Sequence, residues 1–246
     1  MPVSAVPRCM TASGPQIVPL VELFTSEGCD SCPDADRWLT LHFPVTKAPR
    51  TTTVLAFHVD YWDRLGWKDR FATAQFTQRQ YDAMRVSGAT FVYTPQVLVQ
   101  GRDPRSWQTG GVPALLDNAR RRSARASITM EIAAEAAGVH AIHARASVPD
   151  QASRKNAVLW LAYTESRLAS DVKSGENRGV RLTHDHVVRA LKGPYPSDAE
   201  GGISARESVA RPAEAGRSPT FAAVVQDRMT GDVLQTLTMP ACGGGP

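Results

Sequence analysis

The hydrophobic pattern divides the chain into two halves with different periods. Up to about Arg122, short continuous apolar runs alternate with segments whose apolar residues recur every three or four positions. Such runs predict strands covered on both faces, and the longer period predicts amphipathic helices. Strands are expected around residues 20–24, 53–60 and 95–100, and helices around 33–42, 73–86 and 112–119.

After Arg125 the apolar residues alternate with polar ones instead. Strand candidates lie at 128–132, 139–148, 157–164, 182–192, 203–209, 220–227 and 233–238. Alternation places every second side chain on the same face of a strand, and about seven such strands without helices predict an antiparallel β-sandwich. We therefore expect two domains, an α/β domain over 15–122 and an all-β sandwich over 126–240.

The composition excludes several classes of protein. With 42% hydrophobic residues the chain can build a core. The basic run at 120–125 falls where a helix should end and cations offset the helix dipole, so we predict no nucleic-acid partner. No apolar stretch approaches the length of a membrane span. Residues 1–14 lack the apolar segment of a signal peptide, which indicates a cytoplasmic protein or a chain whose signal has been removed.

The turn after the first expected strand carries Cys29-Asp30-Ser31-Cys32. This spacing puts both sulfurs at a helix N-terminus, where unpaired N–H groups stabilise a thiolate. Cys29, nearer the turn, is expected to be exposed and to attack a substrate, and Cys32 to resolve the mixed disulfide. A structural disulfide, or half of a metal site, is the alternative. Four nearby carboxylates disfavour the thiolate: Glu27, Asp30, Asp34 and Asp36.

Three more residues are candidates for the chemistry of this pair. Glu22 interrupts the first apolar run, and it could exchange a proton with Cys32 or pair with an arginine. His58 could complete a Cu(I) site with Cys29 and Cys32, because soft thiolates select Cu(I). Trp62 follows the second strand, and it could wall a groove beside the pair or pack its loop down.

Three features outside this region have open interpretations. Cys9 and Cys242 lie near the two ends of the chain, which are often close in space, so they could form a second disulfide or stay unpaired. His184 and His186 could share a strand face and bind a metal, or lie on the surface. Residues 175–179, Gly-Glu-Asn-Arg-Gly, are expected to form a hairpin loop with glycines at positive φ.

Two of these motifs resemble the thioredoxin superfamily: the Cys-x-x-Cys between strand and helix, and Thr94-Pro95 at the start of a later strand. The resemblance implies that Pro95 is cis and lies against the Cys pair. It also implies that Thr94 and Pro95 hold the substrate disulfide, and we expect Tyr93 and Trp62 to bind the substrate beside them. The function implied is a thiol-disulfide oxidoreductase without a cofactor, acting on a protein or small-molecule thiol or disulfide.

The chain resembles more closely the secreted family catalogued as domain of unknown function 1223. The matching motifs are residues 22–33, 57–63, 93–96, 175–179 and 184–189. The resemblance implies a thioredoxin-like fold and a periplasmic or secreted location. Because the activity of that family is not settled, a non-catalytic binding module or a Cu(I) carrier stays the alternative to the oxidoreductase.

Overall fold

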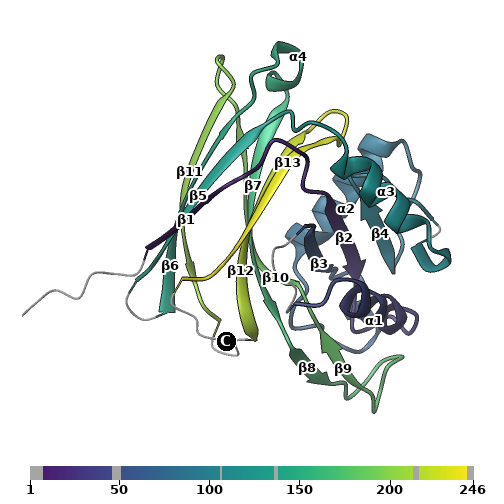
Figure 1. Cartoon of the computed structure of the whole chain (residues 1–246). Coiled ribbons are helices and arrows are strands. Elements are labelled where there is room, and N and C mark those ends of the chain that lie inside the picture. Colours follow the sequence, from purple (N-terminus) through teal and green to yellow (C-terminus); the bar gives the residue numbers. More distant parts are fainter. Residues whose placement is uncertain (1–7, 46–50, 106, 136–137, 213–215, 243–246) are drawn as a thin grey trace, which may run out of the picture.

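The computed structural model describes residues 8–45, 51–105, 107–135, 138–212 and 216–242 (Figure 1). These residues form a seven-stranded sheet, a four-stranded sheet and a two-stranded sheet. The helices that cover the larger sheet gather around its β2–β3–β4 end, away from the four-stranded sheet (Figure 1). No helix among the described residues is long and apolar enough to cross a membrane.

The seven-stranded sheet contains strands from both halves of the chain. Its order is β13 (Val233–Pro240), β12 (Arg217–Asp227), β7 (Ala157–Ser166), β10 (Val187–Pro196), β3 (Thr53–His58), β2 (Leu20–Thr25) and β4 (Gln96–Val99). β10 joins the halves, because it pairs parallel to β3 and antiparallel to β7. All residues of β2 and β3 are buried, as their continuous apolar runs predict.

The prediction of a thioredoxin-like α/β domain followed by a separate β-sandwich is wrong. The strands of the second half continue the sheet of the first half through β10, so one large mixed sheet replaces the two expected units. The expected strand over 182–192 is in fact two strands, which a break at His186 (φ 58°) separates. The part after this break turns into the main sheet. The division of the chain into folding units at 15–122 and 126–240 stays a prediction.

The four-stranded sheet is antiparallel and covers one face of the larger sheet. Its order is β1 (Arg8–Ala12), β5 (Ser127–Ala134), β6 (Val139–Ser147) and β11 (Gly202–Ala210). β5 buries every second residue, as predicted, and Ile128, Met130 and Ile132 pack against Leu161 and Tyr163 of β7. This apolar layer between the sheets is the largest core of the protein.

Helices pack on both faces of β2. Its odd-numbered residues Val21 and Leu23 pack with Leu39 of α1 (Cys32–His42) and with α3 (Gly111–Arg120). Its even-numbered residues lie with α2 (Ala74–Ser87) on the opposite face. α4 (Gln151–Arg154) is a single turn, and η1 (Asp63–Leu65) and η2 (Trp107–Thr109) are short 3₁₀ helices.

The two-stranded sheet is a hairpin of β8 (Leu168–Asp171) and β9 (Arg181–His184) that lies beside α1 (Figure 1). Its loop contains the predicted glycines at positive φ, Gly175 at 75° and Gly179 at 84°. The two ends of the described chain are joined by a disulfide between Cys9 and Cys242, whose Cα atoms are 5.8 Å apart. The predicted hairpin loop is confirmed, and of the two interpretations of Cys9 and Cys242 the structure has the disulfide.

Candidate functional site

Cys29 and Cys32 form a disulfide at the start of α1. Their Cα atoms are 5.4 Å apart, and the Cys32 N–H donates to the Cys29 carbonyl in a tight turn. Cys32 is the first residue of α1, and Pro33 follows it where no intrahelical N–H is needed. Both cysteines have 0% exposure, so the expectation of an exposed Cys29 is wrong.

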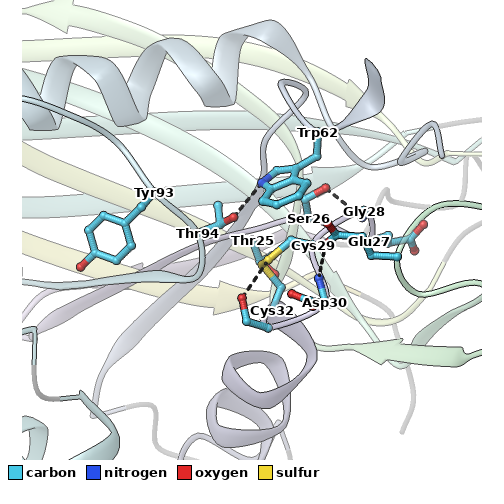
Figure 2. The surroundings of a disulfide bond; sticks show 12 residues. Thr25, Ser26, Glu27, Gly28, Cys29, Asp30, Cys32, Trp62, Tyr93 and Thr94 are labelled. Carbon is cyan, nitrogen blue, oxygen red and sulfur yellow. Dashed lines mark hydrogen bonds between the residues drawn. A yellow bond between two sulfur atoms is a disulfide. The ribbon is translucent and has the colours of Figure 1, made fainter. Parts of the chain in front are cut away.

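Trp62 and Thr94 lie beside the disulfide (Figure 2). The indole N–H of Trp62 donates to Thr94 Oγ1 at 2.8 Å, and the Trp62 ring lies beside the Cys turn (Figure 2). A Cβ atom on Gly28 would come within 3.1 Å of Trp62 Cβ, so the glycine lets the tryptophan pack closely. Trp62 therefore packs onto the turn.

The three predicted substrate residues in the loop before β4 do not all lie at the disulfide. The Thr94–Pro95 peptide bond is cis, as predicted. Thr94 reaches the Cys turn through Trp62, whereas the Tyr93 hydroxyl points away from the sulfurs (Figure 2) and donates to Asp103 Oδ2 at 2.7 Å. The structure therefore brings Thr94, but not the Tyr93 hydroxyl, to the disulfide.

The hairpin loop of the second half holds the Cys turn from the other side. Asn177 Nδ2 donates to the carbonyls of Glu27 and Cys29, each at 2.9 Å, and the Asp30 N–H donates to Glu176 at 3.1 Å. Asn177 is 6% exposed. Sequence reasoning treated this loop as a simple hairpin and missed its contact with the Cys turn.

Glu22 lies on the opposite face of β2 from α1. Arg79 of α2 donates from Nε to Glu22 Oε1 at 2.8 Å, and both side chains are buried. Arg79 also lies over the rings of Phe57 and Trp160. Of the two interpretations of Glu22, the structure has the pair with an arginine and does not bring Glu22 to Cys32.

A cluster of five ionisable side chains is buried next to the Cys turn. Its members, which we call the buried His–carboxylate cluster, are Glu27, Asp36, His58, Asp69 and His184, each at most 6% exposed. They come from the Cys turn, α1, the end of β3, the loop after η1 and the end of β9. Packing of these elements brings together residues up to 157 positions apart.

The contacts within the cluster are short. His58 Nδ1 lies 2.6 Å from Asp69 Oδ2, and Asp69 Oδ2 also accepts from the Glu27 N–H at 2.9 Å. His184 Nε2 lies 3.3 Å from Glu27 Oε1, and His184 Nδ1 lies 3.6 Å from Asp36 Oδ1. The two imidazole rings meet edge to face, with centroids 4.9 Å apart.

Burial and charge act in opposite directions on the pKa values of this cluster. Burial alone would lower the pKa of His184, but the Asp36 and Glu27 carboxylates outweigh burial and raise this pKa to about 10. Burial would raise the pKa of Glu27 and of Asp69, but their histidine neighbours hold each pKa below its usual value. The Asp36 and Glu27 carboxylates therefore favour the protonated form of His184.

The other expected histidine groupings differ from those in the structure. His58 lies with Asp36 and His184, and the described residues contain no group of metal-ligating atoms that joins it to Cys29 and Cys32. Neither interpretation of His184 and His186 fits the structure. Both are buried, so they do not lie on the surface, and His186 Nε2 lies 2.7 Å from the Phe43 carbonyl whereas His184 lies in the cluster. Sequence reasoning counted Glu27 and Asp36 only as charges near the thiols and missed Asp69.

The family model described as "Protein of unknown function (DUF1223)" matches residues 20–226. The chain belongs to this DUF1223 family. The resemblance of the sequence motifs is thereby confirmed for the family, whose function is not established.

Two solved structures share the fold of this DUF1223 protein. One is protein AGR_C_4864 from Agrobacterium tumefaciens, with 23% identity and a TM-score of 0.62, covering 95% of this chain and 99% of that chain. The other is HBP35 of Porphyromonas gingivalis, with 12% identity and a TM-score of 0.65, covering 95% of this chain and 78% of that chain. At these identities the likeness shows the fold alone. No curated protein matches the sequence.

Proposed function

We propose that this DUF1223 protein is a thiol-disulfide oxidoreductase that acts through Cys29 and Cys32. The observation that supports the proposal is the disulfide between two cysteines three positions apart at the N-terminus of α1. Unpaired N–H groups and the positive end of the helix dipole lie there, and both stabilise the thiolate that forms when the bond opens.

The exchange proceeds in two balanced steps. A substrate thiolate attacks Cys29 Sγ, the Cys29–Cys32 bond breaks, and Cys32 leaves as a thiolate that takes up a proton. A second substrate thiolate then attacks the substrate sulfur of the mixed disulfide and releases Cys29. The substrate dithiol loses two electrons and two protons, and the Cys pair gains them. The reverse sequence reduces a substrate disulfide.

Trp62 and Thr94 must move for a substrate to reach this bond, because both cysteines are buried. Cys29 is the attacked cysteine in this proposal, since it lies in the turn beside Trp62 whereas Cys32 belongs to α1. Thr94 and Pro95 then contact the substrate. A bulky Thr94→Arg change should therefore slow exchange with protein disulfides more than with small ones.

The two disulfides also favour an oxidising compartment, because such bonds persist in secreted and periplasmic proteins. We therefore propose a periplasmic or secreted location.

The test is a set of cysteine variants with two measurements. Equilibration with glutathione buffers, followed by alkylation and mass spectrometry, gives the reduction potential of the Cys29–Cys32 pair. Structural disulfides have reduction potentials below about −300 mV, so a catalytic pair should have a potential above this value. Exchange with a fluorescent dithiol peptide should be abolished in Cys29→Ser. Cys32→Ser has a free thiol at Cys29, and it should trap a mixed disulfide when the same peptide is supplied in its disulfide form.

The control is a Cys9→Ser/Cys242→Ser variant, which should keep the exchange. A potential below about −300 mV, together with no exchange in the wild type, would contradict the proposal and leave a structural bridge in a binding module.

A further inference from the structure

We infer that Asp36, His58 and His184 form a buried binding site for a divalent transition-metal ion, with Zn²⁺ as the best fit. One ligand atom from each of these residues lies within 4.8 Å of the others. The inference is independent of the proposed function, because the cysteines take no part in it.

Unpaired polar atoms converge on this point. Seven buried side-chain nitrogen or oxygen atoms of the described residues lack a hydrogen-bond partner, and four of them belong to the buried His–carboxylate cluster. These four are Glu27 Oε1, His58 Nε2, His184 Nδ1 and His184 Nε2. Leaving a buried polar atom unpaired is unfavourable. Glu27 Oε1 and His184 Nε2 lie 3.3 Å apart and face each other, so a ligand bound by His58 Nε2 and His184 Nδ1 would pair with the other two.

Carboxylates orient both imidazoles as they do at metal sites. Histidine ligands usually present their second ring nitrogen to a carboxylate or carbonyl. Asp69 Oδ2 lies 2.6 Å from His58 Nδ1, which leaves His58 Nε2 as the ligand atom. Glu27 Oε1 lies 3.3 Å from His184 Nε2, which leaves His184 Nδ1.

Asp36, the third ligand, is also held by a hydrogen bond. Thr25 Oγ1 donates to Asp36 Oδ2 at 3.0 Å and holds the carboxylate, whose other oxygen lies 3.6 Å from His184 Nδ1. In a tetrahedral zinc site with bonds of about 2.0–2.1 Å, ligand atoms lie about 3.4 Å apart. The spacing of Asp36 Oδ1 and His184 Nδ1 is therefore close to that of zinc ligands.

The charge of the cluster also favours a cation. Glu27, Asp36 and Asp69 bring three negative charges into the interior, and only two histidines accompany them. The other described donors to these carboxylates are uncharged: the Thr25 and Ser170 hydroxyls, the Trp67 indole and the backbone N–H groups of Glu27 and Phe71. Burying unbalanced charge is unfavourable, and a divalent ion offsets it.

The ligand types select among metals. Two imidazoles and one carboxylate suit Zn²⁺, whereas Mg²⁺ and Ca²⁺ prefer oxygen ligands and Cu(I) prefers sulfur. Three protein ligands leave one tetrahedral position, which a water molecule can fill. The ion would join α1, β3 and β9 behind the Cys turn.

The first test measures zinc affinity by competition with a chromophoric chelator, using the disulfide-closed full chain after dialysis against EDTA. The wild type should bind one equivalent. Asp36→Asn and His184→Gln should each weaken binding at least a hundredfold, and Asp69→Asn should weaken it about 10- to 100-fold. His140→Gln is the matched control, because His140 is also buried with an unpaired nitrogen but lies in β6 outside the cluster, and its affinity should be unchanged.

Two further measurements keep the inference testable if a ligand variant does not fold. A Cys29→Ser/Cys32→Ser variant should retain the bound zinc, and X-ray absorption of the zinc-loaded wild type should show nitrogen or oxygen neighbours at about 2.0 Å without sulfur at about 2.3 Å. No binding by the wild type, binding that depends on the two cysteines, or unchanged affinity in both ligand variants would overturn the inference.

Discussion

The indole N–H of Trp62 and the hydroxyl of Thr94 are joined by a hydrogen bond of 2.8 Å that connects the loop after β3 to the loop before β4, beside the Cys29–Cys32 disulfide (Figure 2). Because the disulfide has no exposed surface, we expect this bond to be part of the barrier to its reduction.

Thr94→Val removes the acceptor of this bond and keeps the shape of the side chain. A hydrogen bond contributes about 0.5–1.5 kcal/mol, so reduction of Cys29–Cys32 by dithiothreitol should become roughly two- to tenfold faster. Thr94→Ser keeps the hydroxyl and should leave the rate unchanged. Quenched alkylation followed by mass spectrometry measures both rates, and equal rates in the two variants would show that the bond does not control access.

Asn177→Ala should destabilise the fold. The change leaves the buried carbonyls of Glu27 and Cys29 without their donor, and each unpaired buried group costs about 1–3 kcal/mol. Urea unfolding should therefore give a lower free energy of unfolding than in the wild type. Arg178→Ala, at the exposed neighbouring position, is the control and should have little effect. A similar loss in both variants would mean that the loop, and not the two hydrogen bonds, is responsible.

Glu22→Gln should lower stability without changing the chemistry of the Cys pair. Removing one charge of a buried ion pair costs about 3–5 kcal/mol, and Arg79 would be left buried without its partner. Unfolding in urea measures the loss, and dithiol exchange is measured under conditions where the variant is folded. Slower exchange by folded Glu22→Gln protein would restore Glu22 as a proton partner of Cys32.

The Cys9–Cys242 disulfide should contribute more stability than the Cys29–Cys32 disulfide. The first closes a loop with a sequence separation of 233 and the second a loop with a separation of 3. Because a longer closed loop restricts the unfolded chain more, Cys9→Ser/Cys242→Ser should lose about 2–5 kcal/mol and Cys29→Ser/Cys32→Ser less. Urea unfolding measures both losses, and each double variant is the control for the other. A larger loss in Cys29→Ser/Cys32→Ser than in Cys9→Ser/Cys242→Ser would contradict the expectation.

The contribution of Tyr61 to the free energy of unfolding should be lost at alkaline pH. Burial raises the pKa of Tyr61 to about 12, compared with about 10 in the unfolded chain. The unfolded chain therefore loses this proton first, and the stabilisation present below about pH 10 is lost as the pH rises toward 12. Tyr61→Phe should show a shallower decline of the free energy of unfolding over this range. Identical declines would show that Tyr61 does not contribute.

The local structure around the Cys pair follows from neighbouring residues, so the sequence predicts it well. The strand before Cys29 and the helix that begins at Cys32 depend on contacts within short segments. The cis bond before Pro95 is expected only from the resemblance to the thioredoxin superfamily. An even cysteine count and the proximity of chain ends make a Cys9–Cys242 disulfide one of two interpretations, and only the structure decides for it.

The fold class and the cluster beneath the Cys pair depend on strand order, which periodicity does not specify. The apolar run after Arg181 reads as one strand, yet the break at His186 sends its second part between β3 and β7. The same break leaves His184 on β9 beside α1, where it meets Asp36. His58 and Asp69 become partners only once β3 and its following loop are folded, so no spacing in the sequence marks the cluster.

The hydrogen bonds from Asn177 to the Cys turn form late, because the chain is synthesised from its N-terminus. Cys29 precedes Asn177 by 148 residues, so the ribosome makes the thiol pair long before it makes the residue that holds the pair in place. During that interval the turn lacks two of its hydrogen bonds. An oxidant that acts on the growing chain therefore meets Cys29 and Cys32 in a less protected state than any reagent added to the finished protein.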